Sequence, residues 1–221
     1  PGSNWHVYPI DTGGIANDAH LPAYAKAGFP VAGVLDADPG KARATAERWR
    51  IERVFRSIEE AVTAVPGCVF DVAAPPTAHE AILAALPEGA AVLIQKPRGL
   101  DLEQATAIRA VCRARRLKAA VNFQLRFSPM MLAVADALEQ GLLGRLLDIE
   151  VHLSLRTPWE LFPHLEANPR VEIVSHSIHY LDTIRALAGE PRQVLARTYH
   201  FPGSKLADTR TSAILDYGED L

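Results

Sequence analysis

Short apolar segments alternate with helical segments through the first half of the chain, and this alternation limits the fold more than any other feature. Val69–Ala74 is an almost continuous apolar run, typical of a strand buried on both faces. Pro39–Trp49 and Asp101–Arg116 have the spacing of helices. Because strands that alternate with helices pack as a parallel sheet, we predict an α/β domain over residues 1–121. Its other predicted strands are Val7–Ile10, Val31–Leu35, Val54–Phe55, Ala90–Ile94 and Ala119–Phe123, and its other helices are Ile15–Ala27, Thr77–Leu86 and a short one that begins at Ser57.

Residues 122–221 follow a different pattern. Leu146–Leu155 alternates apolar and polar residues, which predicts a half-buried strand. Gln193–His200 and Thr211–Tyr217 also resemble strands, and Leu161–Pro169 resembles a loop. Long strands with few helices predict a partial α+β domain with a mostly antiparallel, open sheet. The two helices predicted in this domain, each followed by a glycine, are Pro129–Gln140 and Ile173–Ala188.

The turn after the first predicted strand has the layout of a dinucleotide-binding Rossmann domain. Gly13 and Gly14 precede the next helix, which begins at Ile15, and at these three residues the backbone would approach a pyrophosphate. Asp36 ends the second predicted strand, where a carboxylate can accept hydrogen bonds from an adenosine ribose. The same charge would repel a 2′-phosphate, so the sequence favours NAD over NADP as the cofactor.

Asp11 occupies the position of the first glycine in the dinucleotide-binding fingerprint. Its side chain would crowd the tight turn, and its charge would lie near the pyrophosphate. The turn by itself therefore leaves two interpretations open, a cofactor site and a strand–helix turn that binds nothing.

Three further segments connect the chain with a known family. These are Val72–His79, which follows a predicted strand, Gln95-Lys96-Pro97, and Ser175–Asp182 followed by Gly189-Glu190-Pro191. Together with the turn at Gly13, they resemble, in order, the motifs of the glucose-fructose oxidoreductase/inositol dehydrogenase (Gfo/Idh/MocA) family. The likeness extends from Val7 to Tyr217.

The resemblance implies an NAD-dependent dehydrogenase that acts on a sugar, a cyclitol or a related polyol. It implies that Lys96 is the catalytic lysine beside the nicotinamide, that the peptide before Pro97 is cis, and that Pro75 and Pro76 lie along the cofactor. It also implies that the second domain mediates homo-oligomerisation, as a dimer or tetramer. Since family members have several more strands, the resemblance further implies that the second domain is incomplete at Leu221.

Oxidation of an alcohol needs a hydride acceptor and a base for the hydroxyl proton. A lysine beside a cationic nicotinamide favours its neutral form, so we expect Lys96 to be that base. We expect His179 to support it from the second domain, and Asn122 and Arg126 to contact nicotinamide or substrate. His79 is expected to orient the loop near the cofactor. For each of these residues, a role in packing or at the surface is the alternative.

His176 and His179 are three positions apart and share a face of their predicted helix. We expect both to contact substrate. One alternative is a pair of packed histidines that hold the helix in place. A metal site with Asp182 or Glu172 is another, but helical histidine ligands are more often four apart, and we predict no metal.

Two further departures from the family's pattern leave the function open. Gln95 replaces the usual glutamate before the lysine, and Ser175 replaces an aspartate found in many members. With Asp11, these changes favour a non-catalytic cofactor-binding regulator as an alternative. A third hypothesis is a lyase or hydrolase that uses NAD transiently.

Composition excludes several other classes of protein. The 23 lysines and arginines against 26 aspartates and glutamates give a net charge of −3, so no nucleic-acid partner is expected. The basic cluster Arg113, Arg115, Arg116 and Lys118 is interpreted as the end of a helix. No apolar run approaches the ~20 residues of a membrane span, and no membrane partner is predicted. Two cysteines without a CxxC pair fit the cytoplasm.

Overall fold

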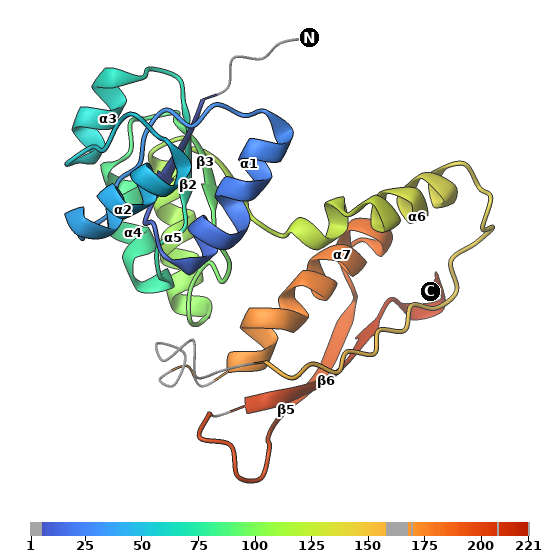
Figure 1. Ribbon diagram of the computed structural model, residues 1–221. Coiled ribbons are helices and arrows are strands. Elements are labelled where there is room, and N and C mark those ends of the chain that lie inside the picture. Colours follow the sequence, from blue (N-terminus) through green and yellow to red (C-terminus); the bar gives the residue numbers. More distant parts are fainter. Residues whose placement is uncertain (1–5, 158–167, 169, 207, 221) are drawn as a thin grey trace. The chain divides into compact units, whose positions relative to one another are not determined.

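The computed structural model describes residues 6–157, 168, 170–206 and 208–220. The chain forms two compact units, Pro1–Asn122 and Phe123–Leu221, and each is considered by itself (Figure 1). No helix in the described part of the chain is long and apolar enough to cross a membrane.

The N-terminal unit contains a four-stranded parallel sheet. Its strands are β1 (Val7–Ile10), β2 (Val69–Val72), β3 (Ala91–Ile94) and β4 (Lys118–Val121), in that spatial order. The strands are paired in register from their first residues, so their carboxyl ends lie at one edge of the sheet. The predicted parallel α/β architecture is confirmed.

Two predicted strands of this unit are reduced to isolated bridges. Val31–Leu35 runs beside β1 but contacts it only through single parallel bridges, and Val54 makes one bridge to Val34. Pro9 explains part of the difference, because a proline in β1 has no backbone N–H to donate to the adjacent chain. The prediction of two regular strands was therefore wrong, although both segments extend the sheet beyond β1.

Helices cover both faces of the sheet, with α1 on one side and α4 and α5 on the other (Figure 1). Asp38 and Asp101 cap the N-termini of α2 and α5, where their side chains accept hydrogen bonds from first-turn amides. The core between α4, α5 and the sheet includes the fully buried Leu83 and Ile108. The helical elements are a π-helical turn at Ala16–His20, α1 (Leu21–Ala27), α2 (Pro39–Trp49), α3 (Ile58–Ala64), α4 (Pro76–Ala85) and α5 (Leu102–Ala114).

The C-terminal unit combines helices with a separate antiparallel sheet, as predicted. Strands β5 (Gln193–His200) and β6 (Asp208–Asp216) pair with each other, with an irregularity at Tyr199/His200. The helical elements are a 3-10 turn at Gln124–Phe127, α6 (Pro129–Glu139), a π-helical turn at Ile173–Ser177, α7 (Ile178–Ala188) and a 3-10 turn at Gly218–Asp220.

The strand predicted at Leu146–Leu155 does not form. The segment has no regular secondary structure, and Leu147 and Leu155 are 64% and 60% exposed. Among the described residues β5 and β6 pair only with each other, so this segment has no neighbour with which to form a ladder. The loop predicted at Leu161–Pro169 lies outside the described residues, apart from Asn168.

Candidate functional site

The turn after β1 is built around Asp11, which has a φ of +75°. Its Oδ1 accepts a hydrogen bond from the Gly13 amide at 2.8 Å. A Cβ on Gly13 would lie 3.0 Å from that oxygen, so the close approach favours glycine at this position. Burial raises the pKa of the Asp11 carboxyl, and the bond from Gly13 opposes this shift. The aspartate thus fits the turn by folding its side chain back onto the backbone.

Asp36 connects the end of the second predicted strand to this turn. Its Oδ2 accepts hydrogen bonds from the backbone N and the Oγ1 of Thr12, at 2.7 and 2.6 Å. Its Oδ1 accepts from the Asp38 amide at 2.8 Å. Burial alone would raise the pKa of Asp36, but these hydrogen bonds outweigh it and hold the pKa below its usual value. A charged carboxylate is therefore fixed beside the glycine turn.

The loop after β2 is held by His79. This side chain is fully buried, and its Nε2 donates to the Ala74 carbonyl at 2.8 Å. Burial lowers the pKa of the imidazole, which favours its neutral form. Pro75 is exposed, and the buried Pro76 begins α4. His79 therefore holds the loop from the buried side, and Pro75 is the part of the loop at the surface.

Lys96 follows β3 directly after the buried Gln95, and the Lys96–Pro97 peptide is cis, as the resemblance implies. The lysine is half-buried, and this burial lowers the pKa of its amine. Asn122 follows the neighbouring β4, and its Nδ2 donates to Gln95 Oε1 at 3.1 Å. The structure thus brings Lys96 and Asn122 to the ends of adjacent strands.

In the C-terminal unit, His179 lies in the first turn of α7 and is 8% exposed. Its ring packs edge-on against Phe123, with ring centroids 5.9 Å apart. Arg126 lies in the 3-10 turn, where its Nε is 3.5 Å from Asp182 Oδ2. These contacts fix both side chains within their own unit.

His176 and Ser175 lie in the π-helical turn that precedes α7. His176 Nε2 is 3.5 Å from Thr157 Oγ1, and Ser175 is buried. Among the described residues, no group of histidine, cysteine, aspartate and glutamate side chains has a metal-binding arrangement.

Sequence reasoning missed a buried polar cluster in the N-terminal unit. Asp71 lies inside β2 and is fully buried, and its Oδ2 is 2.8 Å from both His20 Nδ1 and Tyr24 Oη. The available signal was an aspartate within an otherwise apolar strand, because buried carboxylates occur mainly where polar partners meet them.

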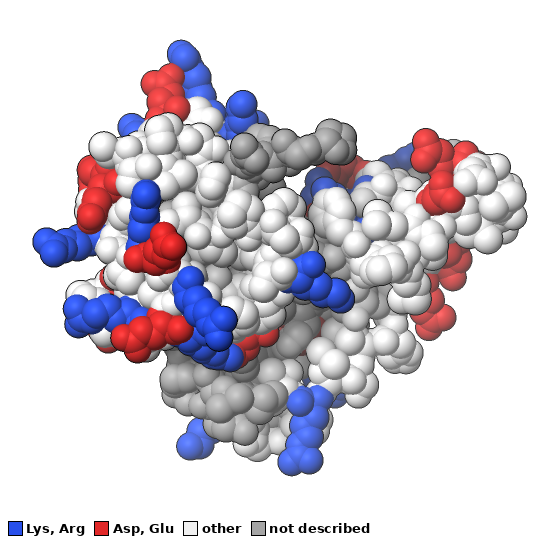
Figure 2. Space-filling view, turned by 45° about the horizontal axis from the view of Figure 1, so that its top comes forward, with Lys and Arg blue, Asp and Glu red and all other residues white. Residues whose placement is uncertain are grey.

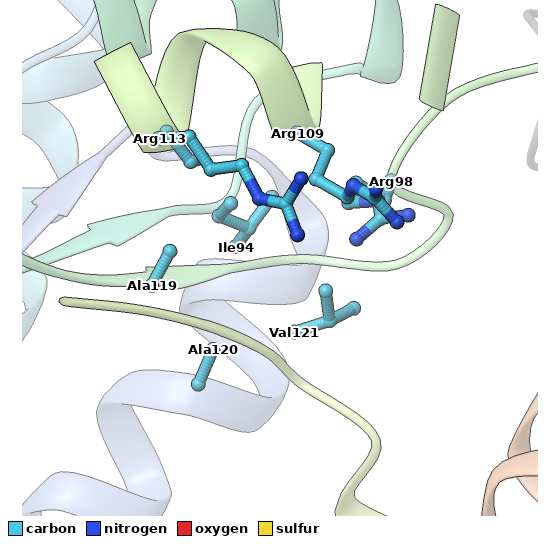
Figure 3. Close-up of a pocket in the computed structure, with 8 residues that line it drawn as sticks. Ile94, Arg98, Arg109, Arg113, Ala119, Ala120 and Val121 are labelled. Atoms are coloured by element: carbon cyan, nitrogen blue, oxygen red, sulfur yellow. The ribbon is translucent and has the colours of Figure 1, made fainter. Parts of the chain in front are cut away.

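A pocket of about 160 Å³ lies between α5 and β4 (Figure 3). Three arginines, Arg98, Arg109 and Arg113, lie above Ala119 and Val121 of β4 in this view. Arg113 is in the last turn of α5, where a cation opposes the helix dipole. The pocket is lined by Ile94, Arg98, Arg109, Cys112, Arg113, Ala119, Ala120 and Val121 and includes none of the predicted site residues. Elsewhere on the molecule, Figure 2 shows basic and acidic side chains interspersed over the visible face.

Comparison with known proteins places this geometry in context. The sequence pattern of the oxidoreductase family with an NAD-binding Rossmann fold matches residues 10–123. D-apiose dehydrogenase from Paraburkholderia graminis is 29% identical over 184 residues, which are 81% of this chain and 48% of the relative. Inositol 2-dehydrogenase 1 from Saccharopolyspora erythraea is 31% identical over 83% of this chain and 55% of its own length. The chain spans about half the length of the curated relatives it matches.

Solved structures share the fold. The WlbA dehydrogenase from Bordetella pertussis, determined in complex with NADH and UDP-GlcNAcA, superimposes with a TM-score of 0.78 at 21% identity. The match covers 96% of this chain and 67% of that one. The superimposed region therefore includes both the parallel sheet of the N-terminal unit and the antiparallel sheet of the C-terminal unit.

Proposed function

Because the chain belongs to the Gfo/Idh/MocA family of oxidoreductases, we propose that it transfers a hydride between NAD and a hydroxyl carbon of a sugar, a cyclitol or a related polyol. One observation carries the proposal: the glycine turn, Lys96 and Asn122 follow three strands of one parallel sheet. Open α/β sheets bind their ligands at this edge. The names of the relatives, an apiose and an inositol dehydrogenase, support the substrate class.

The residues around the turn fit a dinucleotide. Gly13 has no side chain to block the backbone, and the first-turn amides of the following helix, at Gly14 and Ile15, lack acceptors within the helix. The fixed Asp36 carboxylate would accept hydrogen bonds from the adenosine ribose. Pro75 would lie along the cofactor, with Pro76 and His79 shaping its loop from beneath. The bound nicotinamide would supply the hydride chemistry, and NAD is the preferred form.

Lys96 is the proposed proton acceptor when the hydroxyl is oxidised. Burial lowers the pKa of its amine, which increases the neutral fraction that can take a proton. In the reverse direction the same amine returns the proton to the carbonyl oxygen. The substrate is proposed to be oriented by His176, His179 and Arg126 from the C-terminal unit, with His179 assisting the proton transfer.

A non-catalytic cofactor-binding regulator is the second candidate, and the Asp11 carboxylate inside the glycine turn favours it. A panel of sugars and polyols, read by NADH absorbance, distinguishes the candidates. A dehydrogenase forms NADH with at least one substrate, whereas a regulator binds cofactor without turnover. A lyase or hydrolase that uses NAD transiently would consume substrate without net NADH.

We expect Asp11→Gly to strengthen NAD+ binding. The change removes a carboxylate near the pyrophosphate and places glycine at a φ of +75°, where it is unstrained. Asp11→Asn is the matched control, since it removes the charge but keeps a side-chain oxygen that can accept from Gly13. Titration calorimetry at two salt concentrations separates the causes, because salt weakens a charge effect. Unchanged affinity in both variants would show that Asp11 does not disfavour the cofactor.

We also propose that the protein forms homo-oligomers through the β5–β6 sheet, as a dimer or tetramer. This sheet leaves large apolar side chains exposed, with Val194, Leu195 and Ile214 at 56%, 66% and 65%. Burying such side chains against a second copy removes apolar surface from water. Light scattering of the protein, extended to the full length of its relatives, should give a multiple of the chain mass. A monomer mass at micromolar concentration would contradict this proposal.

A reducing compartment, the cytoplasm, is the proposed location. Cys68 is buried, Cys112 is half-buried, and neither forms a disulfide. Buried thiols of this kind behave as small apolar side chains.

A further inference from the structure

A chain of hydrogen-bonded polar side chains runs beneath the carboxyl edge of the parallel sheet. It begins at the Asp71–His20 pair, whose Oδ2 and Nδ1 are 2.8 Å apart. His20 Nε2 lies 3.2 Å from Asn122 Nδ2, and the same Asn122 nitrogen lies 3.1 Å from Gln95 Oε1. Asp71, His20 and Gln95 are 0%, 6% and 8% exposed, so little water competes for these bonds. Of these residues, only Asn122 is part of the proposed cofactor site.

The donor and acceptor roles in this series of hydrogen bonds follow from Asp71. As a carboxylate it can only accept, and it accepts from the Tyr24 hydroxyl at 2.8 Å. Burial, followed by the nearby charge of Asp71, raises the pKa of Tyr24, so this hydroxyl keeps its proton. His20 must then donate through Nδ1–H, and its Nε2, which faces the Asn122 amide nitrogen at 3.2 Å, is the acceptor of that contact. Asn122 therefore turns its NH₂ group toward His20.

The oxygen and nitrogen of an asparagine amide are nearly the same size, so hydrogen-bond partners decide which of them faces a given side. Here the tautomer of His20 decides the orientation of Asn122. With both amide hydrogens used by His20 and Gln95, Asn122 Oδ1 remains as an acceptor with no hydrogen bond to the described residues. Gln95 accepts through Oε1, so its Nε2 remains as a donor. The two strand ends therefore offer one acceptor and one donor side by side.

We propose that Asn122 and Gln95 together bind a primary carboxamide, that of the nicotinamide ring, and that His20 and Asp71 are positioning residues that orient Asn122 for it. A primary carboxamide has one donor and one acceptor, the complement of Asn122 Oδ1 and Gln95 Nε2. The ligand's NH₂ donates to Asn122, and its carbonyl accepts from Gln95. The inference rests on the proposed binding of NAD, and it makes Gln95, which departs from the family's glutamate, a residue that contacts the cofactor.

The tautomer of His20 can be measured without any ligand. Nitrogen NMR of histidine-labelled protein should show His20 protonated at Nδ1 only. In Asp71→Asn, the new amide can donate to Nδ1, so the proton should move to Nε2. Tyr24→Phe is the matched control, because it removes one hydrogen bond to Asp71 without reversing the donor and acceptor roles of the other bonds. A wild-type His20 protonated at Nε2, or at both nitrogens, would overturn the proposal.

Binding of a cofactor analogue tests the consequence. In 3-acetylpyridine adenine dinucleotide a methyl group replaces the carboxamide NH₂, so wild-type protein should bind it about tenfold more weakly than NAD+. In Asp71→Asn, where the Asn122 amide should flip, the ratio of the affinity for NAD+ to the affinity for the analogue should approach one. Gln95→Glu keeps an acceptor for Asn122 but loses the donor, so it should weaken both ligands equally and leave the ratio near ten.

The outcomes separate this inference from the cofactor proposal. If the wild-type protein binds neither dinucleotide, the cofactor proposal fails and this inference fails with it. If it binds NAD+ but does not distinguish the analogue, only the carboxamide role of Asn122 and Gln95 is overturned. If Asp71→Asn does not fold, wild-type His20 and Gln95→Glu still decide the question, since both make definite predictions.

Discussion

Replacing Lys96 with methionine is expected to lower kcat by at least about 100-fold, the usual cost of losing a general base. Methionine has nearly the length of lysine but cannot accept a proton. Because the glycine turn and Asp36 are unchanged, the affinity for NAD+ should stay within a few-fold. Steady-state kinetics with the best substrate of the polyol panel, together with NAD+ titration, provide the measurement. Lys118→Met is the matched control, since this exposed lysine begins β4 at the opposite edge of the sheet.

The pH profile checks the same assignment independently. Burial lowers the pKa of Lys96, so the rate of alcohol oxidation should rise with pH and level off below the ordinary lysine value of about 10.4. Lys96→Met should lose this rise. His179→Asn should raise KM or lower kcat while NAD+ still binds, and His176→Asn should have a smaller effect. Near-normal kcat in Lys96→Met, or a greater effect of His176 than of His179, would contradict the assigned roles.

Cofactor choice is expected to show the second large effect, with NADP+ bound about 100-fold more weakly than NAD+. The 2′-phosphate would lie against the Asp36 carboxylate, and facing like charges cost several kcal/mol. Hydrogen bonds hold the pKa of Asp36 below its usual value, so the carboxylate stays charged at neutral pH.

Asp36→Asn should narrow this gap at least tenfold, mainly through tighter NADP+ binding. Asp38→Asn is the control, because Asp38 lies two positions away and caps α2 with a side-chain oxygen that asparagine also has. Titration of both cofactors into the wild-type protein and into the two variants gives the six affinities needed. Equal affinities in the wild-type protein would remove Asp36 from the ribose site.

Local signals in the sequence predicted most of the N-terminal unit. The bounds of α2 agree with the prediction because local residues define both of its ends. Asp38 caps the helix before Pro39, and Arg50, with a φ of +55°, ends it after Trp49. Leu146–Leu155 shows the opposite case. Its alternation predicts a strand, but a strand also needs a neighbour, and sequence patterns do not supply one.

The candidate site was predictable in part for the same reason. Motifs located Lys96 and Asn122 at strand ends, and the structure places them there. The hydrogen-bond network that links Asp71, His20, Asn122 and Gln95 was not predicted, because its bonded members are up to 102 positions apart and meet only in the folded unit. The joint action of Lys96 and His179 remains a prediction, since each residue lies in its own unit.

Calorimetric titration of NAD+ into the protein tests the central claim, that the glycine turn and Asp36 bind this cofactor, most directly. We expect saturable binding of one NAD+ per chain, weakened by Asp36→Asn and little affected by Lys96→Met. Absence of binding by both NAD+ and NADP+ in the protein extended to the full length of its relatives would contradict it. That result would mean that the turn at Asp11 joins a strand to a helix and holds no cofactor.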